Sequence, residues 1–159
     1  MADKGTASLS ASVFMDDIKS SLGGNSSYEP KDSNDKWLFA EIAVGNSSAD
    51  LVADRDYLGT ADTTVVADDD VAWIAIKNIS TTSTDGIAIR IDAGTAAHNS
   101  AGNIYIGSGE MVVLKTYTTP LASIHAISVT MDGTYGYPSA THSGTVSCQI
   151  AAIVDDGGV

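Results

Sequence analysis

The stretch that decides the fold runs from Val71 to Leu114 and alternates short apolar segments with loops of Ser, Thr, Gly, Asn and Asp. It reads VAWIAIKNISTTSTDGIAIRIDAGTAAHNSAGNIYIGSGEMVVL. Within it, Ile87, Ile89 and Ile91 recur at every second position, which is the period of a strand with one buried face. The residues between them are expected to face solvent. Several such strands at short spacing predict an antiparallel β-sandwich.

The same reasoning extends the pattern to most of the chain. The predicted strands are 37–44, 49–53, 71–79, 87–92, 104–106, 111–116, 124–131 and 145–154. Residues 71–76 are apolar on both faces, which predicts a central strand containing a buried Trp73, and residues 132–143 are expected to form a long loop. Eight strands fit a jelly roll of two four-stranded sheets. A seven-stranded immunoglobulin-like sandwich without the usual paired cysteines is the alternative.

The first 35 residues differ in composition from the rest, so we interpret residues 1–35 as an N-terminal arm and 36–159 as the β-sandwich domain. A chain of 159 residues is long enough for one continuous core. The N-terminus has no apolar segment typical of a secretory signal. No run of apolar residues is long enough to predict a transmembrane helix.

Within this arm, residues 13–22 are predicted to form a short helix. Phe14, Ile18 and Leu22 recur every four residues and would form one apolar stripe. Gly23-Gly24 would end the helix. A helix of two to three turns is marginal alone in water. It would therefore rest on its own sandwich, on a sister subunit or on another protein.

The chain is acidic, with 20 acidic against 8 basic residues and a net charge of −12. Binding to a phosphate backbone needs clustered Lys and Arg, so nucleic acid is not an expected partner. An anionic membrane surface is disfavoured for the same reason. Cys148 is the one cysteine, which excludes an intrachain disulfide. It alternates with Val146 and Ile150 and is expected to be a small buried hydrophobe.

No catalytic or cofactor motif emerges from the sequence. His98, His125 and His142 do not form the spacings of a zinc or iron site. No nucleophile elbow of a serine hydrolase and no phosphate-binding glycine loop is present. We therefore expect no enzyme activity, no cofactor and no metal. Asp68-Asp69-Asp70 is interpreted as a solvated turn, with calcium as the alternative because carboxylate oxygens suit that ion.

Candidate interface residues come from two places, the apolar positions of the arm and a Gly-rich loop that carries two tyrosines. Exposed tyrosines pack well at protein interfaces and also stack on sugars. The candidates for contact with a capsid or a second subunit are Leu9, Val13, Phe14, Ile18, Leu22, Tyr135 and Tyr137.

Short segments spread over most of the chain together resemble a known family of proteins. They are SLSASV (8–13), WIAIKN (73–78), TDG (84–86), DAGTA (92–96), IYI (104–106), GE (109–110), SGTV (143–146) and QIAAI (149–153). Together they resemble the head decoration, or cement, proteins of tailed bacteriophages, especially marine ones. The resemblance implies a small β-sandwich, often trimeric, on the outside of the capsid shell.

The expected function is therefore that of a non-enzymatic virion protein that decorates and stabilises a phage capsid as a homo-oligomer, with a trimer favoured. Its partners would be the major capsid protein and further copies of itself. It would be made in the bacterial cytoplasm and released by lysis, which requires no export signal. The alternative is a carbohydrate-binding or adhesin-like module built on the same sandwich.

Overall fold

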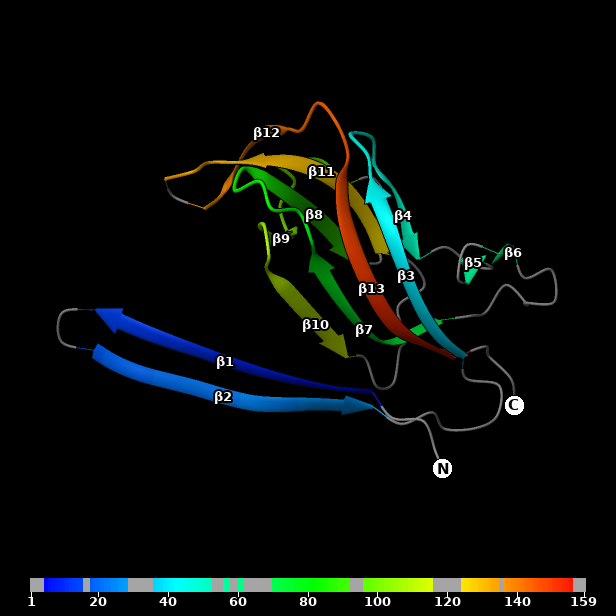
Figure 1. Ribbon diagram of the computed structural model, residues 1–159, viewed down its shortest axis with the longest axis horizontal. Coiled ribbons are helices and arrows are strands. Elements are labelled where there is room, and N and C mark those ends of the chain that lie inside the picture. Colours follow the sequence, from blue (N-terminus) through cyan, green and yellow to red (C-terminus); the bar gives the residue numbers. More distant parts are fainter. Residues whose placement is uncertain are drawn as a thin grey trace.

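The computed structural model describes residues 5–15, 18–28, 36–52, 56–57, 60–61, 70–91, 96–115, 124–134 and 136–155. Throughout this part the secondary structure is β, with antiparallel pairing between strands. Two sheets lie over one another and a long hairpin leaves them at one end (Figure 1). The described residues include no helix long and apolar enough to span a bilayer.

Four strands form the first layer, which we name the β13 sheet. Its order is β10–β7–β13–β3, with β3 (Lys36–Val44), β7 (Asp70–Asn78), β10 (Met111–Lys115) and β13 (Val146–Asp155). The prediction that residues 71–76 lie in an inner strand is confirmed, because β7 pairs with β10 on one side and β13 on the other.

The second layer, the β11 sheet, has the order β12–β11–β8–β9. It contains β4 (Ala49–Val52), β8 (Asp85–Ile91), β9 (Ile104–Ile106), β11 (Ile124–Met131) and β12 (Pro138–Thr141). The long strand β11 pairs with β4 near its start and with β12 at its end. Two further pairs lie outside both layers, β1 (Gly5–Met15) with β2 (Ile18–Tyr28) and β5 (Asp56–Tyr57) with β6 (Thr60–Ala61).

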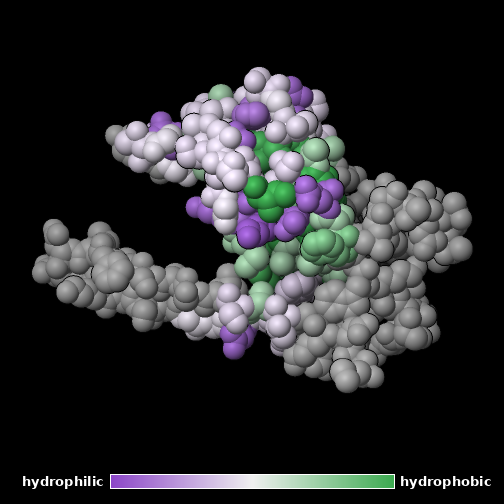
Figure 2. Space-filling view, in the orientation of Figure 1, coloured by the Kyte–Doolittle hydropathy of each residue, from purple (hydrophilic) through white to green (hydrophobic). Residues whose placement is uncertain are grey.

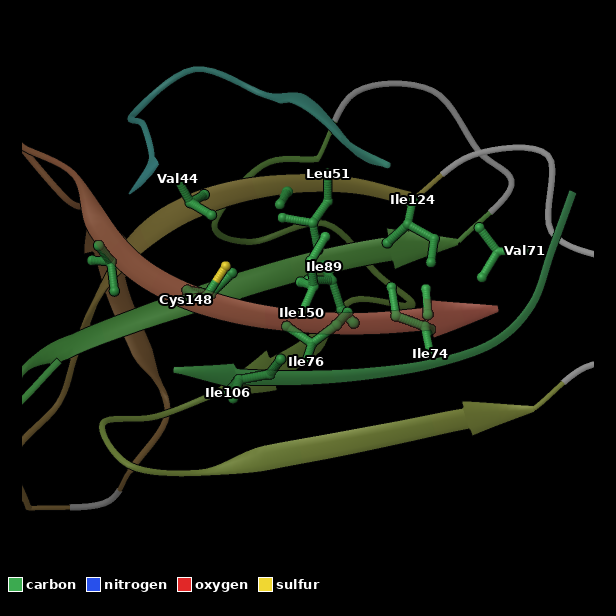
Figure 3. Close-up of a cluster of buried hydrophobic side chains, with 14 residues drawn as sticks. Val44, Leu51, Val71, Ile74, Ile76, Ile89, Ile106, Ile124, Cys148 and Ile150 are labelled. Carbon is green, nitrogen blue, oxygen red and sulfur yellow. The ribbon is translucent and has the colours of Figure 1, made fainter. Parts of the chain in front are cut away.

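The core fills the space between the two layers. Alternate residues of the paired inner strands point into it, among them Ile74 and Ile76 from β7, Ile150 from β13 and Ile89 from β8 (Figure 3). Burying a side chain of this size contributes about 1.5–3 kcal/mol relative to exposure. These facing isoleucines are therefore what holds the two antiparallel sheets together, an arrangement consistent with a β-sandwich.

The outer face of β8 differs from the expectation that it faces solvent. Ala88 is fully buried and packs in a second apolar cluster with Ile127 and Val129 of β11, against which Tyr105 also rests. The segment that contains Ala96 covers this face. The predicted alternation of β8 is therefore confirmed, but part of its outer face is covered by a loop rather than exposed to solvent.

The branch point of β11 is held by one buried hydroxyl residue, Ser128. Its backbone N–H donates to the carbonyl of Gly45 (2.8 Å), and its carbonyl accepts from the N–H of His142 (3.1 Å). The Ser128 hydroxyl donates to the carbonyl of Gly144 (2.9 Å). Because each polar group of Ser128 has a partner, it can lie in the core where β11 changes from β4 to β12.

The predicted helix over residues 13–22 is wrong. Residues up to Met15 belong to β1 and residues from Ile18 belong to β2, in a register that runs from Gly5 opposite Tyr28 to Met15 opposite Ile18. The physical reason is visible in SLSASV, where serine alternates with apolar residues at the strand period of two. Serine is also a weak helix former, and pairing with a second strand supplies the backbone hydrogen bonds that a short helix could not retain.

Cys148 is buried in the core, as the sequence predicts. Burial, and to a lesser degree the negative charge of Glu41, raises the pKa of the Cys148 thiol from 9.0 to about 11. Since the thiolate is the reactive form, we expect the native protein to resist a thiol reagent at pH 8 and to react with one equivalent in denaturant. Rapid labelling of the native protein would contradict this burial.

The raised pKa of Cys148 also predicts how the stability of the protein depends on pH. The pKa of Cys148 is higher in the folded state than in the unfolded state, so the protonated thiol contributes to the free energy of unfolding. This contribution is complete below about pH 9 and is lost as the pH rises through 11. The loss should amount to about 2–3 kcal/mol, at 1.36 kcal/mol per pKa unit. Urea unfolding of Cys148→Ala and wild type across pH 8–11 should show a steeper alkaline decline for the wild type. Parallel curves would contradict the assignment.

Candidate functional site

A polar cleft of about 270 Å³ opens at the end of the sandwich where β7 ends and β10 begins. Three connections line it: the loop of residues 79–84, the turn between β9 and β10, and the loop that follows β11. The lining residues are Thr81, Ser83, Gly107, Ser108, Glu110, Met131, Asp132, Gly133 and Gly136.

The wall of this cleft is anchored by Asn78, the last residue of β7, whose side chain is fully buried. Its amide nitrogen donates to the carbonyls of Asp85 (3.0 Å) and Ile106 (3.3 Å), and its amide oxygen accepts from the backbone N–H of Ser80 (2.9 Å). One side chain therefore ties β8 and β9 to the start of the loop after β7. Sequence reasoning missed this role; the available signal was an Asn that ends an apolar strand just before a Ser/Thr loop.

Hydroxyl groups join the first two connections to each other. The Ser108 hydroxyl donates to the carbonyl of Ser80 (2.6 Å), and the Ser80 hydroxyl donates to Oδ2 of Asp85 (2.6 Å). Within the second turn, Oε2 of Glu110 accepts from the backbone N–H of Gly107 (2.7 Å). Residues 107–109 therefore form a tight turn between β9 and β10, which is closed by the carboxylate of Glu110 that follows it.

The third wall is a compact loop built around Asp132. Its Oδ1 accepts from the N–H of Thr134 (2.8 Å), its carbonyl accepts from Gly136 (2.9 Å), and its own N–H donates to the carbonyl of Tyr137 (2.7 Å). These bonds give the chain the sharp reversal that leads into β12, a strand that the sequence prediction assigned to a loop. Tyr137 follows directly and remains 53% exposed.

The groups that line this cleft are hydrogen-bonding groups. Its lining offers the carboxylates of Glu110 and Asp132 and the hydroxyls of Thr81, Ser83 and Ser108, without a lysine, arginine or histidine. Such groups suit a neutral ligand rich in hydroxyls. In the described part of the chain, no group of three or more His, Cys, Asp or Glu side chains could hold a metal ion.

Two of the three histidines, His98 and His142, lie within hydrogen-bond distance of nearby groups. Nδ1 of His142 accepts from the N–H of Gly144 (3.0 Å), which leaves Nε2 facing Oδ1 of Asp85 at 3.4 Å. Nδ1 of His98 lies 3.2 Å from the hydroxyl of Thr141. His125 lies within β11, opposite Arg90.

The predicted interface residues fall at two separate places. Leu9, Val13 and Phe14 lie in β1 and Ile18 and Leu22 in β2, along a hairpin whose base is next to the end of β10. Tyr137 lies instead directly after Gly136, which lines the cleft. Tyr135 and the acidic pair Asp68-Asp69 are outside the described residues, and Asp70 begins β7.

The hairpin base packs on the outer face of the β13 sheet, the face turned away from the β11 sheet. Ala7 packs against a buried cluster that contains Trp73 and Ile153. Nε1 of Trp73 donates to the hydroxyl of Ser26 (3.3 Å), and Nζ of Lys115 donates to the carbonyl of Ser27 (2.6 Å). Trp73 is therefore buried, as the sequence predicts, although it lies beneath the hairpin rather than between the sheets.

Comparison with known proteins identifies no relative. No family model matches the chain, and neither the curated proteins nor the solved structures include a match.

Proposed function

We propose that this chain is a non-enzymatic structural protein of a virion, which decorates the outer surface of a phage capsid as a homotrimer. The sequence resemblance to phage head decoration proteins motivates the proposal. The structural observation that best supports it is the β1–β2 hairpin. Beyond its base, this hairpin runs away from the two sheets (Figure 1).

A hairpin of this form needs a partner. Its two strands of 11 residues each pair with one another in one continuous register. From the Ala7–Ser26 pair to the tip it extends for eight residues, a reach of about 27 Å at about 3.4 Å per residue. A two-stranded ribbon is marginally stable at best in water. Contact with a sister subunit or with the capsid shell would supply the missing stabilisation.

The proposed architecture of the domain is a jelly roll. Numbered along the chain, the strands β3, β4, β7, β8, β9, β10, β11 and β13 take the orders 1-8-3-6 and 2-7-4-5 in the two sheets. This order is the one expected for a jelly roll, and it supports that reading over an immunoglobulin-like sandwich. Viral capsid proteins and lectins both use jelly rolls.

The trimer is tested by the mass of the free protein. Light scattering at micromolar concentration should give about three times the 16.3 kDa of one chain, since closed symmetry limits the assembly to a finite ring. A mass of one chain would overturn the trimer. Co-sedimentation with purified empty phage heads tests decoration, and protein that stays in the supernatant at saturating shell would overturn it.

The polar cleft favours a second candidate function, a carbohydrate-binding module. Its hydroxyl and carboxylate lining and the exposed Tyr137 are the group types that recognise sugars. A glycan array tests this directly. Specific binding that is lost in the double variant Thr81→Ala/Ser83→Ala, together with no binding to phage heads, would favour this function over decoration.

A further inference from the structure

The two faces of the β1–β2 hairpin can be told apart at its base. Ala7 and Ser26 are paired, and both contact the Trp73 cluster of the β13 sheet. The next pair, Ser8 and Asn25, lies on the opposite face, where the Ser8 hydroxyl donates to Oδ1 of Asn25 (2.9 Å) in an exposed position. Because residues alternate between the faces of a strand, this assigns every later pair to one face or the other.

The register places nearly all apolar residues of the hairpin on the face that carries Ala7. Positions on that face are Ala7, Leu9, Ala11, Val13 and Met15 in β1 and Ile18, Ser20, Leu22, Gly24 and Ser26 in β2. The opposite face carries five serines, together with Thr6, Phe14, Lys19, Gly23 and Asn25. The hairpin is therefore amphipathic, and its apolar face continues outward from a residue already seated on a sheet.

This register also corrects the predicted apolar stripe. Ile18 and Leu22 share a face with Leu9 and Val13, but Phe14 lies opposite Lys19 on the other face. Four of the five arm residues predicted at an interface are thus brought to one side of the hairpin, and the fifth is not.

A matching apolar surface remains open on the β13 sheet. Next to the covered Trp73 row runs a second row across all four strands, made of Val113, Ala75, Ala151 and Phe39. Three of these are half-buried, whereas Phe39, on the edge strand β3, is 62% exposed. Figure 2 shows apolar surface over these strands, bordered by polar clusters.

We propose that the hairpin of one copy packs its apolar face onto this Phe39 row of a second copy. The surface is continuous with an interface the chain already makes, since the hairpin base covers the adjacent Trp73 row with the same strand face. Beyond its base the hairpin runs away from its own sheet, so the row it can reach belongs to a neighbour (Figure 1).

The dimensions and the polar border agree with this fit. Four strands about 4.8 Å apart span about 14 Å, which a hairpin reaching about 27 Å beyond its base can cross. The row beyond Phe39 contains exposed Lys77 and Glu41. An apolar strip with charged residues at its border is the usual anatomy of a protein interface. The inference rests on the homo-oligomer proposed above and names the surfaces that form it.

A photo-crosslink tests the contact directly. Benzoylphenylalanine is placed at position 39 in the full-length protein, and equal amounts of light and heavy isotope-labelled chains are mixed through denaturation and refolding. We expect adducts between position 39 and residues 9–22, half of them heavy–light pairs. Adducts within one chain, or adducts of a second copy outside residues 5–28, would overturn the proposal.

Substitutions give a second, independent readout. Phe39→Asp and Leu9→Asp should lower the mass of the oligomer to that of one chain at micromolar concentration while the β-sheet spectrum is retained. The matched controls are Ala140→Asp, at an exposed position of β12 in the other sheet, and Phe14→Asp, on the opposite face of the hairpin. Both controls should keep the oligomer mass.

The outcomes separate this inference from the proposed function. A wild-type mass of one chain overturns both the trimer and the exchange of hairpins. A trimer that persists in Phe39→Asp and Leu9→Asp overturns the exchange alone and leaves the trimer and the decoration of capsids standing.

Discussion

Replacing Asn78 with alanine should lower the free energy of unfolding by about 3–5 kcal/mol, because each buried polar group left without a partner costs about 1–3 kcal/mol. The Asn78 amide supplies hydrogen bonds to the carbonyls of Asp85 and Ile106, in a place where the side chain has no contact with water. Alanine would leave both carbonyls without this donor. Its smaller volume would also leave a void in a packed interior.

Urea unfolding followed by circular dichroism measures this effect, with Asn46→Ala as the matched control. Asn46 is exposed in the turn between β3 and β4, so its replacement should change stability by less than about 0.5 kcal/mol. Amide exchange adds a local readout, since the N–H of Ser80 loses its acceptor in Asn78→Ala and should exchange faster. A loss of stability below about 1 kcal/mol would contradict the role assigned to Asn78.

The strands of the two layers could be predicted because burial on one or both faces leaves a clear pattern. Residues 104–106 and 124–131 were predicted with the bounds of β9 and β11, and the other six differ by one or two residues at one or both ends. Prediction failed for β12 because Pro138, Ser139, Ala140 and Thr141 carry no apolar alternation. This strand forms at an edge, where it pairs with β11 while its side chains are mostly exposed.

The hairpin was predicted as a helix because two periods coexist within the same short segment of the chain. Phe14, Ile18 and Leu22 are spaced like a helical face, whereas Leu9, Ala11 and Val13 alternate like a strand. The decisive fact is the pairing of Ala7 and Ser26 over Trp73, a contact between residues far apart in the chain. Tertiary contacts of this kind override a local pattern, and a single sequence contains no direct record of them.

The polar cleft was equally hidden from sequence reasoning. Its walls come from three separate connections spread along the chain between Thr81 and Gly136, and each connection taken alone is an ordinary loop rich in Ser, Thr, Gly or Asp. Their approach depends on Asn78 and Ser108, which bond across loops rather than within them. Residue types alone could suggest Tyr137 as an exposed contact, but they could not show that its carbonyl accepts from the N–H of Asp132 in the wall of the cleft.

Replacing Gly86 with alanine should destabilise the fold through one crowded contact. A Cβ at this position would lie 2.5 Å from Cγ and Sδ of Met131 and 3.0 Å from Cγ2 of Val129. Glycine in a strand often marks such a close approach. Since Met131 and Val129 are both buried, the added methyl group must displace packed atoms, at a cost of about 1–3 kcal/mol.

A double-mutant cycle with Met131→Ala isolates this contact. Met131→Ala alone should cost about 2–5 kcal/mol, because it leaves a cavity in a buried cluster. In the double variant the new methyl group occupies part of that cavity, so the combined loss should fall short of the sum by about 0.5–3 kcal/mol. The free energies of unfolding of the four proteins in urea give the coupling directly.

The control for the cycle is Gly45→Ala, where an added Cβ meets no atom within 4 Å and the backbone has an ordinary φ. It should change stability by no more than about 1 kcal/mol, and stabilisation is the expected direction because alanine restricts the unfolded chain. Losses that add up without coupling between positions 86 and 131 would show that Met131 does not limit the space at Gly86. The packing of β8 against the end of β11 would then need another explanation.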